Sequence, residues 1–254
     1  MWNPYDFTGK RFIVTGATSG MGRATAIKLS EQGAEVCLLA RSEEKLKETL
    51  PLLSGQGHRC YVKNFSEPEG YKEIFDDIVS DGHKIDGLVH CAGMAKILPV
   101  TLLSKKTMDE SMTVNLYSFV EMTSLLSKKK YHDKASIVGV SSISVRYPQK
   151  CQGIYVATKS AMNTIVTAMA IELAEKGIRV NTVMPSTTNT QMAKEAFENK
   201  TEEQIKEAIG QQVLGLIEPE DIADIIMFLL SDASRMITGR EIYADGGYID
   251  FIAK

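Results

Sequence analysis

The chain has 254 residues, of which 44% are hydrophobic and 24% are charged, and its formal net charge is -3. This composition is that of a folded globular protein, and its slight negative charge excludes the strongly basic surface typical of proteins that bind nucleic acids or anionic membranes. Because no apolar run approaches the roughly 18 residues of a spanning helix, we expect neither a nucleic acid nor a membrane as a partner.

Short runs rich in β-branched and apolar residues alternate with longer helical patterns along the chain. From the N-terminus, the predicted order is strand 11–15, helix 25–32, strand 35–40, helix 43–53, strand 59–63, helix 71–80, strand 86–90, helix 107–130, strand 135–141, helix 155–176, strand 178–184, helix 219–230 and strand 241–244. This alternation implies βαβ units and a parallel sheet. Strands without polar alternation imply that helices cover both faces of the sheet.

We therefore predict an α/β fold, namely a Rossmann-type, doubly wound parallel sheet of about seven strands with helices on both faces. No linker, low-complexity segment or repeat divides the chain, so a single domain over residues 1–254 is the simplest organisation. The least regular stretch is 186–215. We expect it to lie outside the carboxyl ends of the strands, where open α/β sheets bind ligands.

The cysteines and the N-terminal segment favour a cytoplasmic location. Cys37, Cys60, Cys91 and Cys151 are scattered and form no C-x-x-C pair, so we expect neither a disulfide framework nor a metal site. Residues 1–10 lack the basic stretch followed by an apolar run that marks a secretory signal.

A glycine-rich turn, 15–22, follows the first predicted strand and leads into the first helix. Gly16, Gly20 and Gly22 have the spacing G-x-x-x-G-x-G. Glycine permits a tight turn and lets backbone amides approach a pyrophosphate closely, and a helix N-terminus adds partial positive charge. The turn therefore predicts a dinucleotide site, although a simple strand-to-helix connection would have the same composition.

The residue type at the end of the second strand indicates which dinucleotide binds. Folds that bind NAD place an acidic residue about 20 positions after the glycines, where it binds the ribose 2′-hydroxyl. Ala40 stands near that place and Arg41 follows it. An arginine provides a planar, charged fork that suits a 2′-phosphate. We therefore predict NADP(H) rather than NAD(H), with a solvated loop arginine as the alternative.

Tyr155 and Lys159 form a Y-x-x-x-K pair at the start of a helical pattern. Residues four apart share one helix face, so both side chains can reach one cleft. The ammonium is expected to pull the tyrosine pKa from its usual value near 10 toward neutrality. A tyrosine tuned in this way would be an effective general acid or base.

Two further polar residues accompany this pair. Ser142 follows the fifth strand, so its hydroxyl is placed to bind a substrate carbonyl; the alternative is a turn or helix-cap role. Asn115 lies inside a predicted helix, where asparagine is disfavoured. It is either functional or a buried amide that satisfies local backbone groups.

Together these residues resemble the short-chain dehydrogenase/reductase family in its single-domain form. The resemblance extends over nearly the whole chain, and the segments that carry it are 15–22, Asn115, Ser142, Tyr155, Lys159, 185–190 and 245–247. It implies that Tyr155 is the proton donor or acceptor and that Lys159 binds the nicotinamide ribose and lowers the tyrosine pKa. It also implies that Ser142 orients the carbonyl and that Asn115 supports a water chain to Lys159.

The resemblance also implies a set of cofactor-binding positions. They are Gly16, Thr18, Ser19, Gly20, Met21, Gly22, Arg41, Asn64, Phe65, Ala92, Gly93, Tyr155, Lys159, Pro185, Thr188 and Thr190. The chain departs from the family pattern at Asn64, where an aspartate is usual, at His90 and Cys91, where two asparagines are usual, and at Ser186, where a glycine is usual. His90 is expected to be structural.

The function implied is NADP-dependent hydride transfer between nicotinamide and a small-molecule carbonyl or alcohol. The pattern is most similar to that of 3-oxoacyl-[acyl-carrier-protein] reductases, whose substrate is carrier-bound. Those enzymes often have an arginine before the glutamate of the sixth helix, and here Ile171 precedes Glu172. A sugar or small-ketone reductase therefore remains the alternative. A lysine cluster offers another carrier site or only a solvated surface: Lys128, Lys129, Lys130 and Lys134.

Other protein classes remain open at this point. A nucleotide-sugar epimerase or dehydratase shares the Y-x-x-x-K pair but usually has a second substrate domain. A non-catalytic NADP-binding sensor or scaffold would need only the glycine turn. Family members usually form dimers or tetramers, and the apolar stripe of helix 155–176 predicts a homodimer or homotetramer unless that stripe is buried within one subunit.

Overall fold

The computed structural model describes residues 3–198 and 200–248. Seven parallel strands form one sheet in the order β3-β2-β1-β4-β5-β6-β7. They are β1 (Arg11–Thr15), β2 (Glu35–Ala40), β3 (Arg59–Val62), β4 (Gly87–His90), β5 (Ala135–Val140), β6 (Ile178–Pro185) and β7 (Glu241–Ala244). The predicted fold class is confirmed, and each predicted strand is present.

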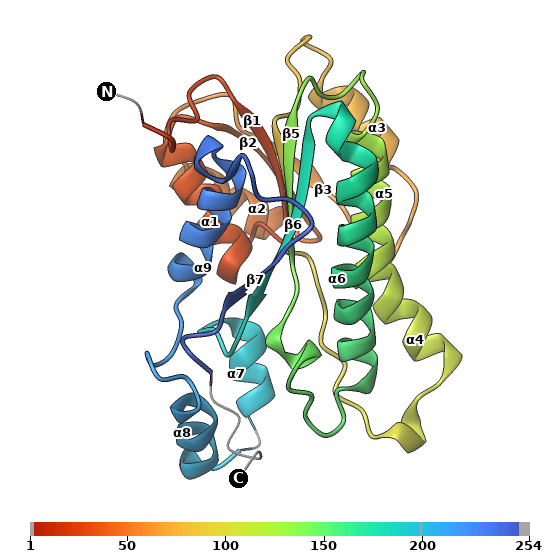
Figure 1. Ribbon diagram of the computed structural model, residues 1–254, viewed down its shortest axis with the longest axis vertical. Helices are drawn as coiled ribbons and strands as arrows, with labels where there is room; N and C mark the ends of the chain where they lie inside the picture. Colours follow the sequence, from red (N-terminus) through yellow and green to blue (C-terminus); the bar gives the residue numbers. More distant parts are fainter. Residues whose placement is uncertain (1–2, 199, 249–254) are drawn as a thin grey trace.

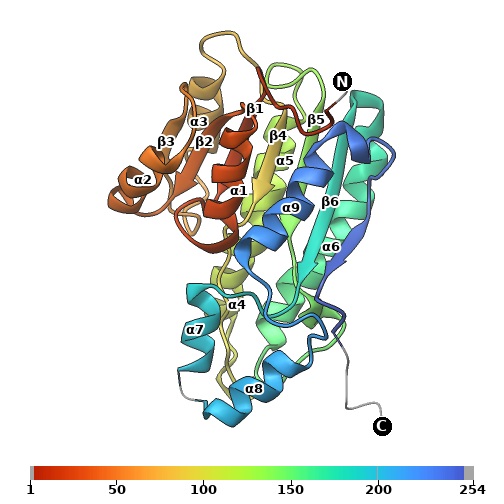
Figure 2. The same cartoon turned by 90° about the vertical axis from the view of Figure 1, so that its left-hand side faces the viewer.

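Helices cover both faces of this sheet. They are α1 (Gly20–Glu31), α2 (Glu43–Thr49), α3 (Tyr71–Ile78), α4 (Lys105–Met112), α5 (Ser118–Leu126), α6 (Gly153–Leu173), α7 (Gln191–Phe197), α8 (Glu202–Gly210) and α9 (Pro219–Leu230). Helices α1, α2 and α9 lie on one face, and α3, α5 and α6 lie on the other (Figure 1). Helices α4, α7 and α8 extend past the carboxyl ends of the strands (Figure 2).

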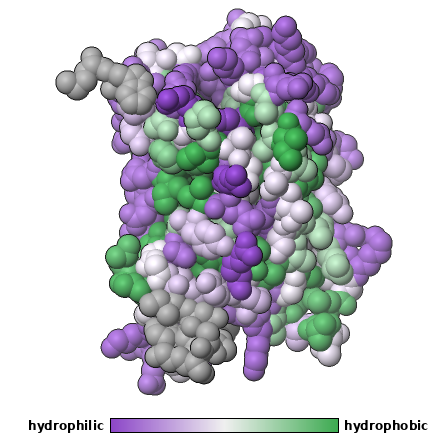
Figure 3. All heavy atoms as spheres, viewed as in Figure 1, coloured by the Kyte–Doolittle hydropathy of each residue, from purple (hydrophilic) through white to green (hydrophobic). Residues whose placement is uncertain are grey.

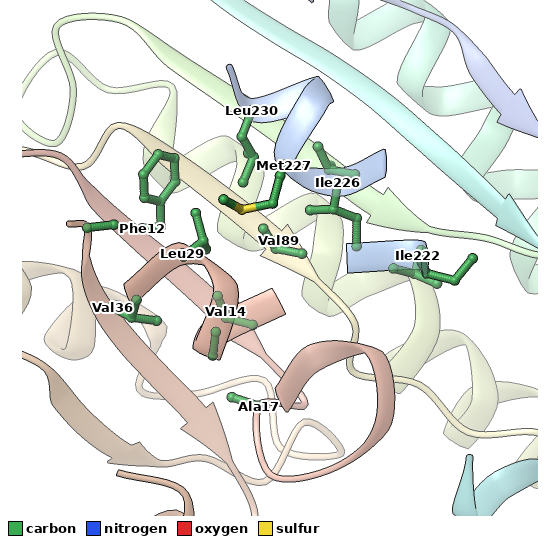
Figure 4. Packing of buried hydrophobic residues seen from close by; sticks show 14 of the residues in the cluster. Phe12, Val14, Ala17, Leu29, Val36, Val89, Ile222, Ile226, Met227 and Leu230 are labelled. Carbon is green, nitrogen blue, oxygen red and sulfur yellow. The ribbon is translucent and has the colours of Figure 1, made fainter. Parts of the chain in front are cut away.

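The core is divided between the two faces because successive side chains of a strand point in opposite directions. Phe12 and Val14 of β1 pack with Leu29 of α1 and Leu230 of α9 (Figure 4). Ile13, which lies between them in sequence, belongs to the cluster on the opposite face. Each face of the sheet therefore has its own hydrophobic cluster.

The predicted helix over residues 107–130 is present as a continuous helical run over 105–126, but its ends differ and a π-helical turn interrupts the α-helix. Helix α4 begins at Lys105, a π-helical turn covers Thr113–Tyr117, and α5 ends at Leu126. The side chain of Asn115 forms hydrogen bonds outside the helix, which explains the irregular turn. The Ser127 hydroxyl donates to the Ser124 carbonyl oxygen at 2.8 Å, and this local bond competes with continuation of the helix.

The prediction that 186–215 is irregular was wrong, because α7 and α8 form there. Each of the two helices begins at a threonine whose hydroxyl accepts a backbone N–H: Thr190 from Ala193 and Thr201 from Gln204. Gln204 completes a capping box at Thr201, a sequence signal that was present. The helices are short and largely exposed, so each shows at most one apolar repeat: Ile205, Ala208 and Ile209 in α8.

Other helix ends differ less. Helix α1 begins at Gly20 rather than at residue 25, inside the glycine turn. Helix α2 ends at Thr49 because Pro51 follows and lacks a backbone N–H; a 3₁₀ turn covers Leu50–Leu52. Within the described residues no helix is long and apolar enough to cross a membrane. The four cysteines are free thiols.

Candidate active site

The turn between β1 and α1 brings two parts of the backbone into close contact. Gly16 and Gly20 have φ angles of 63° and 50°, in the left-handed region that favours glycine. A Cβ atom at Gly22 would lie 2.4 Å from the carbonyl oxygen of Gly16, so a larger residue would displace the turn. The three glycines line a cavity of about 290 Å³ in front of the N-terminus of α1.

Most of the predicted cofactor positions line this cavity. They are Gly16, Thr18, Ser19, Gly20, Met21, Gly22, Arg41, Asn64, Phe65, Ala92, Gly93 and Thr190. Tyr155, Lys159, Pro185 and Thr188 do not line it. Pro185 and Thr188 are buried at the carboxyl end of β6, where the Thr188 hydroxyl donates to the Ser186 carbonyl oxygen.

The cavity also contains residues that the sequence analysis missed. They are Ser42, Lys45, Ser66, Cys91, Met94, Val114, Gln191 and Met192. Ser42 caps α2 by accepting the Lys45 backbone N–H at 3.2 Å. Lys45 could have been predicted as a cofactor-binding residue from the sequence. It is a cation four positions after Arg41, near the start of a predicted helix, so it adds positive charge beside Arg41.

Tyr155 and Lys159 lie together in α6, behind the cavity. Lys159 is 4% exposed, and its Nζ donates to the Val140 carbonyl oxygen at 2.6 Å. The same nitrogen is 5.9 Å from the centre of the Tyr155 ring. Burial lowers the pKa of Lys159 to about 8.

The expectation that Lys159 lowers the pKa of Tyr155 does not hold in this structure. Burial raises the pKa of Tyr155, and a hydrogen bond with Ser142 opposes that rise only in part. The pKa of Tyr155 is set by burial and by Ser142, while the Lys159 ammonium donates to the Val140 carbonyl oxygen. Tyr155 is therefore a protonated phenol at neutral pH.

Ser142 combines the two roles considered for it. It caps the 3₁₀ turn Ile143–Val145, where its Oγ accepts the Ser144 backbone N–H at 3.1 Å. It also lies within hydrogen-bond reach of the Tyr155 hydroxyl, as the effect on the tyrosine pKa shows. A substrate carbonyl held by Ser142 would therefore lie beside that hydroxyl.

Asn115 is a buried amide that satisfies polar groups of neighbouring segments. Its Oδ1 accepts the Met94 backbone N–H at 2.8 Å, and its Nδ2 donates to the Met94 carbonyl oxygen and the Thr158 hydroxyl, each at 2.9 Å. The side chain thereby ties the loop after β4 to α6. This corresponds to the alternative interpretation of Asn115.

Gly93 joins the cavity to the tyrosine and lysine. It lines the cavity, yet a Cβ atom there would lie 3.5 Å from Asn115 Oδ1 and 3.6 Å from Lys159 Nζ. Only the glycine backbone separates the two groups of residues at this point. A ligand that extends along the cavity toward Gly93 therefore approaches Lys159.

His90 and Cys91, the two residues at the end of β4 that depart from the family pattern, lie in the core and at the cavity wall, respectively. His90 is fully buried between the rings of Phe65 and Phe119, and its Nε2 is 2.8 Å from the Ser118 hydroxyl. Burial lowers the pKa of His90 to about 3, so it is a neutral core residue. Cys91 lines the cavity, and burial raises the pKa of its thiol to about 12.

Comparisons with known proteins agree over nearly the whole chain. A family model described as enoyl-(acyl carrier protein) reductase matches residues 16–249. The 3-oxoacyl-[acyl-carrier-protein] reductase FabG of Thermotoga maritima is 31% identical, over 95% of this chain and 98% of the relative. L-rhamnose 1-dehydrogenase (NADP(+)) of Thermoplasma acidophilum is also 31% identical, over 96% and 98%. A solved short-chain type dehydrogenase/reductase from Mycobacterium ulcerans is 28% identical, with a TM-score of 0.87 over 95% of this chain and 90% of that one.

Proposed function

Because this chain belongs to the short-chain dehydrogenase/reductase family of oxidoreductases, we propose that it reduces the carbonyl group of a small-molecule substrate with NADPH. The observation that carries the proposal is the position of Gly93, which borders both the dinucleotide cavity and Lys159. A single domain over residues 1–254 is part of the proposal. Its basis is that the described strands form one sheet.

The residues of the cavity fit a dinucleotide phosphate. The side-chain-free turn at Gly16, Gly20 and Gly22 would hold the pyrophosphate, and Arg41 with Lys45 would hold the 2′-phosphate. Asn64 and Phe65 would lie against the adenine, and Thr190, with the backbone near Thr188, would hold the carboxamide. NADPH supplies the hydride when it is bound. An NADP-dependent relative supports this choice of cofactor.

Tyr155 is the proposed proton donor to the substrate oxygen. Its raised pKa keeps the hydroxyl protonated at neutral pH, which is the state that carbonyl reduction requires. Ser142 donates a hydrogen bond to the same oxygen and holds it at the phenol. Lys159 in its charged form would bind the nicotinamide ribose, and Asn115 keeps the surrounding loop in place.

We propose a free carbonyl substrate, such as a sugar or small ketone, ahead of a carrier-bound acyl thioester. The lysine cluster at residues 128–134 precedes β5, whereas Ser142 follows it. Six residues of strand span roughly 20 Å, so a carrier docked on that cluster would be at the wrong end of the sheet. The 3-oxoacyl thioester remains the second candidate because of the similarity to FabG.

A substrate panel tests this function. The absorbance of NADPH would be followed with keto-sugars, small ketones and acetoacetyl thioesters, and NADH would replace NADPH in parallel. We expect turnover of a free carbonyl with NADPH. Turnover of the thioester alone would select the second candidate. Binding of NADPH without turnover of any substrate would instead indicate a sensor or scaffold.

We propose that the protein is a cytoplasmic homodimer or homotetramer. Helix α6 leaves Ala157, Ala168 and Ile171 exposed, and Ile171 is 76% exposed. The surface over α6 is largely apolar or weakly polar (Figure 3). Such a face is stabilised when a second copy covers it, and light scattering after gel filtration would measure the assembly.

A further inference from the structure

Lys63 is a buried cation directly after β3, outside the proposed reaction centre. It is 5% exposed, and both acceptors of its ammonium are backbone carbonyls: Nζ donates to the Glu67 oxygen and, at 2.6 Å, to the Glu69 oxygen. The nitrogen also lies 4.4 Å from the centre of the Tyr71 ring. Burial lowers the pKa of Lys63, which shows that the charge is costly there.

The loop held by this ammonium forms one wall of the nucleotide cavity. Asn64, Phe65 and Ser66 line the cavity and directly precede the two carbonyls that Lys63 binds. Other contacts also hold the start of the loop: the Asn64 side chain binds the Ser66 N–H and the Glu67 carboxylate, and the Phe65 ring is buried. The Phe65 ring packs 6.4 Å from that of Tyr71, the other contact of Lys63.

We propose that Lys63 is a positioning residue for the nucleotide. Its ammonium ties two loop carbonyls and the Tyr71 ring together, and this fixes the position of the cavity wall formed by Asn64, Phe65 and Ser66. The inference rests on the proposed function, because it assumes that the cavity binds NADP(H). Without the cation, the two loop carbonyls lose their shared donor and the loop is no longer tied to the Tyr71 ring through Lys63. Tyr155 lies on another element, so the chemistry itself is unaffected.

The test compares Lys63→Met with a matched control. Methionine has a similar length but neither charge nor donors, and Lys72→Met removes an exposed lysine from the neighbouring α3. NADP⁺ binding would be measured by calorimetry, kcat at saturating NADPH by absorbance, and the exposure of residues 64–70 by hydrogen exchange. We expect Lys63→Met to raise the Kd about tenfold, to leave kcat within about twofold and to speed exchange in the loop. Lys72→Met should change none of these.

Further variants make every outcome decisive. Lys63→Arg retains the charge and should recover most of the lost affinity. If Lys63→Met fails to fold, Lys63→Gln retains a donor for one carbonyl and should raise the Kd several-fold. An unchanged Kd in a folded Lys63→Met or Lys63→Gln protein overturns the role of Lys63 but leaves the proposed function in place. Failure of the unaltered protein to bind NADP⁺ overturns the proposed function instead.

Discussion

At the scale of single residues, burial dominates the electrostatics of the site. It raises the pKa of Tyr155 and lowers that of Lys159 to about 8. Both shifts favour the uncharged side chain, as expected for groups removed from water. At neutral pH the phenol therefore keeps its proton while most of the lysine is still charged, which is the combination that carbonyl reduction needs.

The pH dependence of reduction follows from these shifts. Lys159 is protonated below its lowered pKa and loses its charge as the pH rises through about 8. We expect kcat/KM for reduction to be level near neutrality and to fall above about pH 8, well below the usual range of a lysine. Lys159→Met should give a lower rate without this step. A profile that stays level to pH 10 would contradict the assignment.

Arg41 determines the choice between the two dinucleotides in this account. Arg41→Asp replaces the cation that would pair with the 2′-phosphate by a carboxylate, whose negative charge repels the phosphate. We expect the Kd of NADPH to rise about 30-fold, corresponding to ~2 kcal/mol, and that of NADH to change little. Lys47→Asp is the control, because Lys47 is an exposed lysine on α2 that does not line the cavity. Equal losses for NADPH and NADH would rule out this role.

At the scale of elements, hydrogen bonds join the two ends of the segment that contains α7 and α8. The Ser186 hydroxyl donates to Gln212 Oε1 at 3.0 Å, and Gln212 Nε2 donates to the Gly215 carbonyl oxygen at 2.9 Å. Nearby, Thr188 pairs with Ile217 as an isolated parallel bridge. The two ends of the segment are thus held together, which fixes the start of α7 at the cavity.

Ser186→Ala should weaken this closure. Gln212 is 2% exposed, so loss of the hydroxyl leaves a buried oxygen with one partner fewer. We expect the free energy of unfolding to fall by about 1 to 2 kcal/mol, seen in urea as a lower midpoint with an unchanged slope. Ser124→Ala, at an exposed position of α5, serves as the comparison. Equal midpoints for the two variants would show that the Ser186 bond contributes no stability.

At the scale of the whole molecule, much of the fold could be predicted from the sequence. Strands such as β2 are short apolar runs between turn residues, and their alternation with helices determines a parallel sheet. The π-helical turn at Asn115 could not be predicted, since it depends on Met94 and Thr158, which are distant in sequence. Helices α7 and α8 were missed because they are short, with seven and nine residues, so their caps are the clearest signal.

Most of the candidate site, like most of the fold, could be predicted from the sequence. Gly16, Gly20, Arg41 and the other turn and loop positions line the cavity because short motifs determine local backbone geometry. The state of Tyr155 was not predictable from its spacing to Lys159. Burial and the hydrogen bond with Ser142 decide it, and both arise from tertiary packing.

The central claim is that the dinucleotide cavity and Tyr155 form one reaction centre. The most direct measurement is NADPH oxidation by Tyr155→Phe with the best carbonyl substrate, together with the Kd of NADPH by fluorescence titration. We expect the rate of NADPH oxidation by this variant to be at least ~100-fold lower than that of the unaltered protein, and its Kd for NADPH to stay within about threefold. Turnover that is unchanged in this variant would contradict the central claim.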